Sequence, residues 1–326
     1  MTTIETTSSS TAALSDWLST FGAALEAGDI DAAVSMFADE SYWRDLVTFT
    51  WNMKTVEGHD QIRAMLEARL ADVKPSGFVI EGEANEADGV VDGWFNFETD
   101  LARGHGQIRL VDGKCWTLLT TMVELKGHEE PSRTTRPKGI EHGVVPGRKN
   151  WAEAKAEDEA TLGYSEQPFC VIIGGGQGGI ALGARLRMLG VPTIIVEKNP
   201  RPGDSWRNRY KSLCLHDPVW YDHLPYIKFP ENWPIFAPKD KLGDWLEMYT
   251  KVMELNYWGS TECQSASYDE ASGQWTVTVE RQHEDGSTET VVLKPEQLVL
   301  ATGMSGRPNI PEIEGADTFA GDIHHS

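Results

Sequence analysis

Three glycines are the residues of this chain most clearly arranged for chemistry. Gly174, Gly176 and Gly179 have the spacing G-x-G-x-x-G. In such a turn the first glycine permits a tight bend, the second lets the backbone approach a pyrophosphate, and the third lets helix and strand pack closely. The amino end of the following helix directs free N–H groups at the phosphates. The spacing indicates a dinucleotide site, and by itself it does not separate FAD from NAD(P).

The segments around the glycines supply the elements that such a site needs. The apolar run 169–173 predicts a buried parallel strand, 180–189 a helix, and 193–196 a second strand. Glu197 follows that strand, 18 residues after Gly179, at the position where an acid accepts hydrogen bonds from a ribose hydroxyl. This context argues against an ordinary glycine turn without a ligand.

The rest of the same domain is predicted to complete the sheet. Segment 239–255 has the apolar period of an amphipathic helix packed on a core. Residues near 262–266, 275–279 and 290–293 predict a three-stranded antiparallel meander. Residues 298–302 predict the final parallel strand, with its carboxyl end at the ligand crevice.

Further motifs extend the pattern. They are Gly203-Asp-Ser-Trp-Arg207, Ala301-Thr-Gly303 and Phe319-x-Gly321-x-x-x-His325. Together with the glycine motif and its acid, they resemble the flavin-containing monooxygenase superfamily, including its plant-type and Baeyer–Villiger members. The resemblance covers residues 167–326 and implies an α/β Rossmann-type FAD-binding domain with a β-meander.

The resemblance implies that FAD binds at the first glycine motif. The cofactor-binding residues it implies are Gly174, Gly176, Gln177, Gly178, Gly179, Glu197, Lys198, Ser205, Trp206, Arg207, His216, Asp217, Thr302 and Gly303. The glycines would face the pyrophosphate and Glu197 the adenosine ribose. Ser205 to Arg207 would wrap the pyrophosphate and ribityl chain, although Trp206 could instead belong to the core.

His216 is the one catalytic candidate that the resemblance supplies. It stands where plant-type members carry a histidine near the flavin ring, and a satisfied structural histidine is the alternative. Phe319, Gly321 and His325 match the signature at the junction to the NADPH domain. The second glycine motif, which binds NADPH in this family, does not occur in the sequence. The chain is therefore expected to be an incomplete fragment, truncated before that domain.

The function implied by the resemblance is that of an NADPH- and O2-dependent flavin monooxygenase. It would act on a small organic substrate through a C4a-hydroperoxyflavin. An FAD-dependent reductase without oxygenation is one alternative, and a non-catalytic FAD-binding or dimerisation fragment is another. None of the four cysteines forms C-x-x-C, which argues against a thioredoxin-reductase-like enzyme. The sequence does not identify the substrate or the type of oxygenation.

Residues 12–126 have a different organisation, with helices first and then strands joined by Asp-Gly turns. This α+β domain resembles the NTF2-like (SnoaL-like) cone in Trp43-Arg-Asp45, Trp51 and Gly58-x-x-x-Ile62. Asp45, assisted by His59 and Glu98, is a candidate general base in the cone pocket. A tryptophan-rich core or a dimer surface is the alternative, and the resemblance allows a homodimer through this domain.

The remaining segments are predicted to be connections. Residues 1–11 predict a disordered tail and 127–166 a linker. Within the linker, 151–162 predicts a charged surface helix, with Asn150 as its cap and Glu153 completing a capping box.

Composition and charge argue against several classes of partner, targeting segment and binding site. A net charge of −21 disfavours nucleic acid as a partner. Lys and Arg are absent from the first 43 residues, which argues against a signal or transit peptide, and no apolar run is long enough to span a membrane. The unpaired cysteines suit a reducing cytoplasm. No metal site is expected, because the adjacent His324 and His325 would point to opposite faces of an extended segment.

Overall fold

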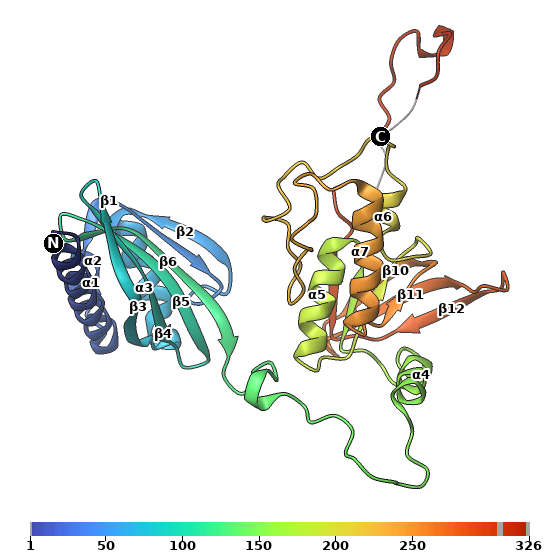
Figure 1. Cartoon of the computed structure of the whole chain (residues 1–326), viewed down its shortest axis with the longest axis horizontal. Coiled ribbons are helices and arrows are strands. Elements are labelled where there is room, and N and C mark those ends of the chain that lie inside the picture. The colour runs from blue at the N-terminus through green and yellow to red at the C-terminus, as the bar shows by residue number, and fades with distance from the viewer. Residues whose placement is uncertain (1, 305–308, 324–326) are drawn as a thin grey trace. The chain divides into compact units, whose positions relative to one another are not determined.

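The chain divides into two compact units, Met1–Glu129 and Glu130–Ser326. The computed structural model describes residues 2–304 and 309–323, and Figure 1 shows the elements of each unit. No helix within these ranges is both long and apolar enough to cross a membrane.

The first unit is an α+β domain. Its elements are α1 (Thr2–Ala27), α2 (Ile30–Ser35), β1 (Phe37–Leu46), β2 (Met53–Glu57), α3 (Gly58–Val73), β3 (Ser76–Ala87), β4 (Val90–Glu98), β5 (Ala102–Val111) and β6 (Lys114–Leu125). The strands form one sheet in the order β2-β1-β6-β5-β4-β3. Only the β1–β6 pair is parallel, and helix α3 and four strands separate these neighbours in the chain.

Two Asp-Gly pairs join the strands of this sheet. Asp88 and Gly89, between β3 and β4, have φ of 50° and 78°. Asp112 and Gly113, between β5 and β6, have φ of 50° and 74°. Positive φ at both central residues matches the twist of antiparallel strands, so the prediction of hairpins at these pairs is confirmed.

Aromatic side chains fill the interior of the first unit. The eight buried rings are Trp17, Phe21, Phe37, Trp43, Phe49, Phe78, Phe95 and Phe97. Phe78 stacks on Phe97 with ring centroids 5.2 Å apart. A Cβ atom at Gly104 or Gly106 of β5 would come within 2.3 Å of the Phe97 or Phe95 ring, so both glycines make room for aromatic packing.

Helix α1 begins at Thr2, so the segment predicted as a disordered tail is helical instead. Ser10 is buried and its hydroxyl donates a hydrogen bond to Glu86. The Thr11 hydroxyl accepts a hydrogen bond from the amide of Ala84 at 2.9 Å. These contacts with β3 are long-range, and composition alone did not reveal them.

The second unit contains a doubly covered parallel sheet. Its main elements are α4 (Trp151–Thr161), β7 (Cys170–Ile173), α5 (Gln177–Met188), β8 (Thr193–Val196), α6 (Asp204–Arg207), α7 (Lys239–Val252), β9 (Tyr257–Trp258), β10 (Thr261–Asp269), β11 (Gln274–Gln282), β12 (Thr288–Leu293) and β13 (Gln297–Leu300). The parallel sheet has the order β13-β7-β8-β9, and β10-β11-β12 form the predicted antiparallel meander.

Alternate side chains of the parallel strands bury against different layers. Ile172 and Ile195 pack with helices α5 and α7, which run side by side in Figure 1. Val171 and Ile194 pack with valines of the meander. Burial on both faces explains why these strands are continuous apolar runs in the sequence.

Helix α4 has the predicted cap. The Asn150 side chain accepts from the amide of Glu153 at 2.9 Å, and the Glu153 carboxylate accepts from the amide of Asn150 at 2.8 Å. The helix buries none of its own residues, as expected for a surface helix. The Trp151 indole N–H donates to Glu254 at 2.8 Å.

Candidate dinucleotide-binding site

The glycine motif lies where the strand order of the parallel sheet reverses. From β7 the chain passes through α5 to β8 on one side, while β13 pairs with β7 on the other. In open α/β sheets, ligands bind outside the carboxyl ends of the strands at this switch point. Gly174 leaves β7 with φ of 111°, and a Cβ atom there would lie 2.4 Å from the carbonyl oxygen of Ala301. The end of β13 and the glycine turn therefore meet, while contact of Thr302 and Gly303 with a cofactor stays a prediction.

The other motif glycines have two different surroundings. A Cβ atom on Gly179 would lie 2.0 Å from the carbonyl oxygen of Gly174, so only glycine lets α5 start this close to the turn. At Gly176, the N-cap of α5, the nearest atom to an added Cβ is the Ser205 hydroxyl at 3.7 Å. At Gly178 no described atom lies within 4 Å. The amino end of α5 therefore faces open space.

Glu197 follows β8 and turns its buried carboxylate toward the glycine turn. Its Oε2 accepts from the amide of Gly175 at 2.7 Å. Its Oε1 accepts from the backbone and side-chain nitrogens of Asn199 at 2.9 and 2.7 Å. A carboxylate has about four acceptor positions, so these three bonds leave capacity for a ribose hydroxyl.

Ser205 and Trp206 of α6 lie beside the start of α5. The Trp206 indole N–H donates to the side chain of Gln177, the first residue of α5, at 3.1 Å. The Ser205 hydroxyl is inaccessible to solvent and has no hydrogen-bond partner among the described residues. A buried polar group without a partner costs about 1–3 kcal/mol, and a phosphate oxygen would supply one after the side chain turns toward the space beside Gly176.

Arg207, which the resemblance assigns to the cofactor, is held by carboxylates in this structure. Its guanidinium contacts Asp204 at 3.0 Å, Asp244 at 2.9 Å and Glu247 at 2.9 Å. Asp244 and Glu247 belong to α7, so Arg207 fastens α6 to α7. Contact with a cofactor stays a prediction for this residue.

The remaining predicted residues are not brought to the glycine turn by any recorded contact. His216 and Asp217 are exposed in the long connection between α6 and α7, and Lys198 is exposed after Glu197. Phe319 is exposed and its ring lies against Gly321, where a Cβ atom would be 2.6 Å from it. His325 lies outside the described residues, as does His324. Within the described ranges, no three His, Cys, Asp or Glu side chains cluster as metal ligands would.

Tyr257 was not foreseen as part of the site. Its hydroxyl donates to the carbonyl oxygen of Gly175 at 3.2 Å. Strand β9 contains only Tyr257 and Trp258, which is too short for a periodic sequence signal. Burial and, to a lesser degree, the charges of Glu197 and Asp204 raise the pKa of Tyr257, so its hydroxyl stays a donor.

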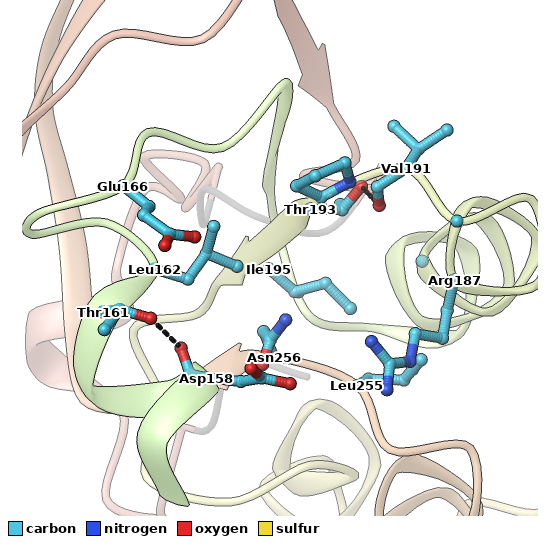
Figure 2. A pocket seen from close by; sticks show the side chains of 13 residues that line it. Asp158, Thr161, Leu162, Glu166, Arg187, Val191, Thr193, Ile195, Leu255 and Asn256 are labelled. Atoms are coloured by element: carbon cyan, nitrogen blue, oxygen red, sulfur yellow. Dashed lines mark hydrogen bonds between the residues drawn. The ribbon is translucent and has the colours of Figure 1, made fainter. Parts of the chain in front are cut away.

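A cavity of about 200 Å³ lies at the amino ends of the strands of the parallel sheet. Its lining includes Thr193 at the start of β8 and Asn256 just before β9. Figure 2 shows Asp158 of α4 on one side of it and Arg187 of α5 on another. Because parallel strands start at one edge and end at the other, this cavity is remote from the glycine turn. None of the predicted cofactor residues lines it.

In the first unit, the carboxylate of Asp45 is a buried acceptor of several hydrogen bonds. Its fully buried carboxylate accepts from the amides of Phe49 and Thr50 and from the hydroxyls of Thr50 and Thr120. The Thr120 hydroxyl in turn accepts from the Trp43 indole N–H at 2.9 Å. Val47, with φ of 60°, begins the turn that these bonds hold, and β1 ends before it. Every acceptor position is in use, which favours the tryptophan-rich core over a general base.

The other two candidate residues of that site, His59 and Glu98, contact groups other than Asp45. A ring nitrogen of His59 lies 3.1 Å from the carbonyl oxygen of Phe37, and the exposed Glu98 pairs with Lys126 at 2.9 Å. Hydrogen bonding to Lys126 is the main reason that the pKa of Glu98 is lowered. The structure records no contact that unites His59, Glu98 and Asp45.

The fold and the site together define a SnoaL-like domain followed by a Rossmann-type flavoprotein oxidoreductase domain. Residues 18–120 match the family described as SnoaL-like domain. Residues 168–326 match the family described as pyridine nucleotide-disulphide oxidoreductase. The predicted combination of the two domain types is confirmed.

Individual relatives of the chain are monooxygenases by name. Over 160 residues the chain is 33% identical to an indole-3-pyruvate monooxygenase of Oryza sativa subsp. japonica, covering 49% of this chain and 37% of the relative. It is 35% identical over 158 residues to a probable indole-3-pyruvate monooxygenase of Arabidopsis thaliana, covering 48% and 36%. The chain therefore spans little more than a third of the length of these curated relatives.

Solved structures also match the chain over the same share of its length. One is a flavin-containing monooxygenase from Stenotrophomonas maltophilia, with 25% identity and a TM-score of 0.39. The match covers 47% of this chain and 44% of that chain.

Proposed function

We propose that the second unit binds FAD and belongs to an NADPH- and O2-dependent flavin monooxygenase that acts on a small organic substrate. The observation that carries the proposal is the open space at the amino end of α5. Gly176 and Gly178 border this space, and the unpartnered hydroxyl of Ser205 lies next to it. Relatives named as monooxygenases support the assignment of the dinucleotide as FAD.

The residues of the turn fit the shape and charge of the cofactor. Backbone N–H groups at the start of α5 would hold the pyrophosphate, together with the Ser205 hydroxyl. Glu197 would accept from the adenosine ribose. Bound FAD supplies hydride acceptance and reaction with O2, while the protein orients it and excludes water. His216 and Asp217 remain proposed neighbours of the flavin, as do Lys198, Thr302 and Gly303.

The oxygenation step and the source of hydride belong to the whole protein. NADPH is proposed as the donor, and the F-x-G-x-x-x-H signature as the junction to its domain. The names of the relatives make indole-3-pyruvate the first substrate to test. An FAD-dependent reductase remains the competing function, distinguished by peroxide in place of an oxygenated product.

For the first unit we propose a structural or dimerising role. Its interior is occupied by eight aromatic rings, and the carboxylate of Asp45 is saturated by hydrogen bonds. Exposed apolar side chains on its surface include Trp51, Met53 and Trp94. Such residues are available to a second copy of this domain.

The first experiment is titration of the purified chain with FAD, followed by flavin fluorescence and the visible spectrum. Saturable binding at a ratio of one FAD per chain supports the proposal. Absence of binding to a folded chain contradicts it. Anaerobic addition of NADPH to the flavin-loaded chain then tests for a hydride donor site, because reduction bleaches the flavin spectrum.

A further inference from the structure

The residue between the first two glycines of the motif is held at both of its backbone polar groups. Its N–H donates to Oε2 of Glu197 at 2.7 Å, and its carbonyl oxygen accepts from the Tyr257 hydroxyl at 3.2 Å. The residue is Gly175, which neither the fingerprint nor its usual interpretation singles out. Glu197, which directly follows β8, and Tyr257, which belongs to β9, thus fix one residue of the turn.

The Tyr257 ring also packs directly on Gly175. A Cβ atom at Gly175 would lie 2.3 Å from the Tyr257 hydroxyl oxygen and 2.5 Å from Cε2. Parallel pairing with β8 sets the position of the ring, since Tyr257 is in register with Ile195 and Trp258 with Val196. The contact is therefore built by the sheet and does not depend on a mobile surface side chain.

We infer that Tyr257 is a positioning residue for the phosphate-binding turn, an inference that rests on the proposed binding of FAD. Its hydroxyl holds the carbonyl of Gly175 on the β9 side, while Glu197 holds the N–H on the β8 side. With Gly175 fixed, the N–H groups from Gly176 onward are presented to the open space at the start of α5. Tyr257 itself does not touch the cofactor.

If Tyr257 positions the turn, removal of its hydroxyl weakens FAD binding because the FAD-free turn becomes less ordered. Without the hydroxyl, the turn samples arrangements in which its N–H groups do not converge. Apparent affinity falls in proportion to the fraction of chains that keep the competent arrangement. A variant that keeps this arrangement in about one chain in five would bind FAD about fivefold more weakly.

The test compares Tyr257→Phe with the matched control Tyr268→Phe, an exposed tyrosine of β10. Two quantities are measured on the full chain: the dissociation constant for FAD, and backbone amide hydrogen exchange of residues 175–179 without FAD. For Tyr257→Phe we expect an FAD dissociation constant raised about fivefold and faster exchange in this segment. Tyr268→Phe should match the parent chain in both, and the melting temperature of each FAD-free variant shows whether it is folded.

Unchanged affinity and unchanged exchange in a folded Tyr257→Phe variant would overturn the inference. A lower melting temperature with unchanged affinity would also overturn it, since that result indicates a purely structural contact. If the parent chain does not bind FAD, the proposed function fails. In that case the exchange comparison still decides whether Tyr257 holds the turn.

Discussion

Selected glycines of the two units have opposite surroundings. In the first unit, the positions that side chains of Gly104 and Gly106 would take are occupied by the rings of Phe97 and Phe95. In the second, the corresponding space at Gly176 and Gly178 is open. At Gly104 and Gly106 the absence of a side chain makes room for core packing, and at Gly176 and Gly178 it leaves open space. The neighbours of a missing Cβ separate a packing role from a ligand-binding role.

The two buried carboxylates repeat this contrast. Asp45 accepts from two amides and two hydroxyls inside the first unit. Glu197 accepts from Gly175 and Asn199 beside the glycine turn. A saturated carboxylate organises the fold around itself, whereas one with spare capacity beside open space can bind a ligand.

The largest effect is expected from Asp45→Ala. The substitution removes the acceptor of four donors, of which those of Phe49 and Thr120 are buried, and each buried group without a partner costs about 1–3 kcal/mol. We expect the first unit to lose roughly 4 kcal/mol of unfolding free energy or more, measured by calorimetry. Asp39→Ala, at an exposed position of the same strand, is the control and should change little. A variant of Asp45 with parent-like stability would reopen a catalytic role.

Gly104→Ala is expected to destabilise the first unit by about 2 kcal/mol, because overpacking forces a ring from its position. All three nearest atoms to the added Cβ belong to the Phe97 ring. A double-mutant cycle with Phe97→Leu should therefore recover part of the loss. Additive effects of the two substitutions would show that the ring does not cause the strain.

Gly176→Ala should weaken FAD binding and leave the FAD-free fold intact. The added methyl group meets no protein atom closer than 3.7 Å, yet it enters the space where we propose that the pyrophosphate binds. We expect a dissociation constant raised about tenfold, roughly 1.4 kcal/mol, with a melting temperature close to that of the parent. Equal losses of stability and affinity would indicate that Gly176 serves packing, as Gly104 does.

Ser205→Ala sharpens the same comparison with a smaller effect. Removing an unpartnered buried hydroxyl should leave the FAD-free chain as stable as the parent or slightly more stable. Loss of its bond to phosphate should raise the FAD dissociation constant about fivefold, or roughly 1 kcal/mol. Ser267→Ala, at an exposed position of β10, is the control in both measurements. Unaltered affinity in Ser205→Ala would remove this residue from the site.

Local signals accounted for much of the fold. Strand β8 occupies the predicted residues 193–196, and helix α4 begins at Asn150 with its capping box. Both Asp-Gly pairs of the first unit join antiparallel strands, as expected of hairpins. These features depend on neighbours within a few residues, so the order of residue types is sufficient to predict them.

Contacts between distant segments were beyond the reach of such signals. Two of the three carboxylates around Arg207, Asp244 and Glu247, lie on α7, 37 and 40 residues further along the chain. Ser10 and Thr11 of α1 hydrogen-bond to Glu86 and Ala84 of β3, more than 70 residues away. Sequence spacing says which residues are neighbours on one element, and not which elements meet.

The sequence by itself determined the order of domains, the glycine motif with its acid, and the class of ligand that the motif suits. Spacing within one strand–turn–helix unit is a local property, which is why the sequence carries it. Only the tertiary structure decided which groups hold that turn. Tyr257 reaches Gly175 because β9 pairs with β8, and Asp45 is saturated because β6 brings Thr120 to it. Strand pairing places these groups, and pairing depends on the whole packed sheet.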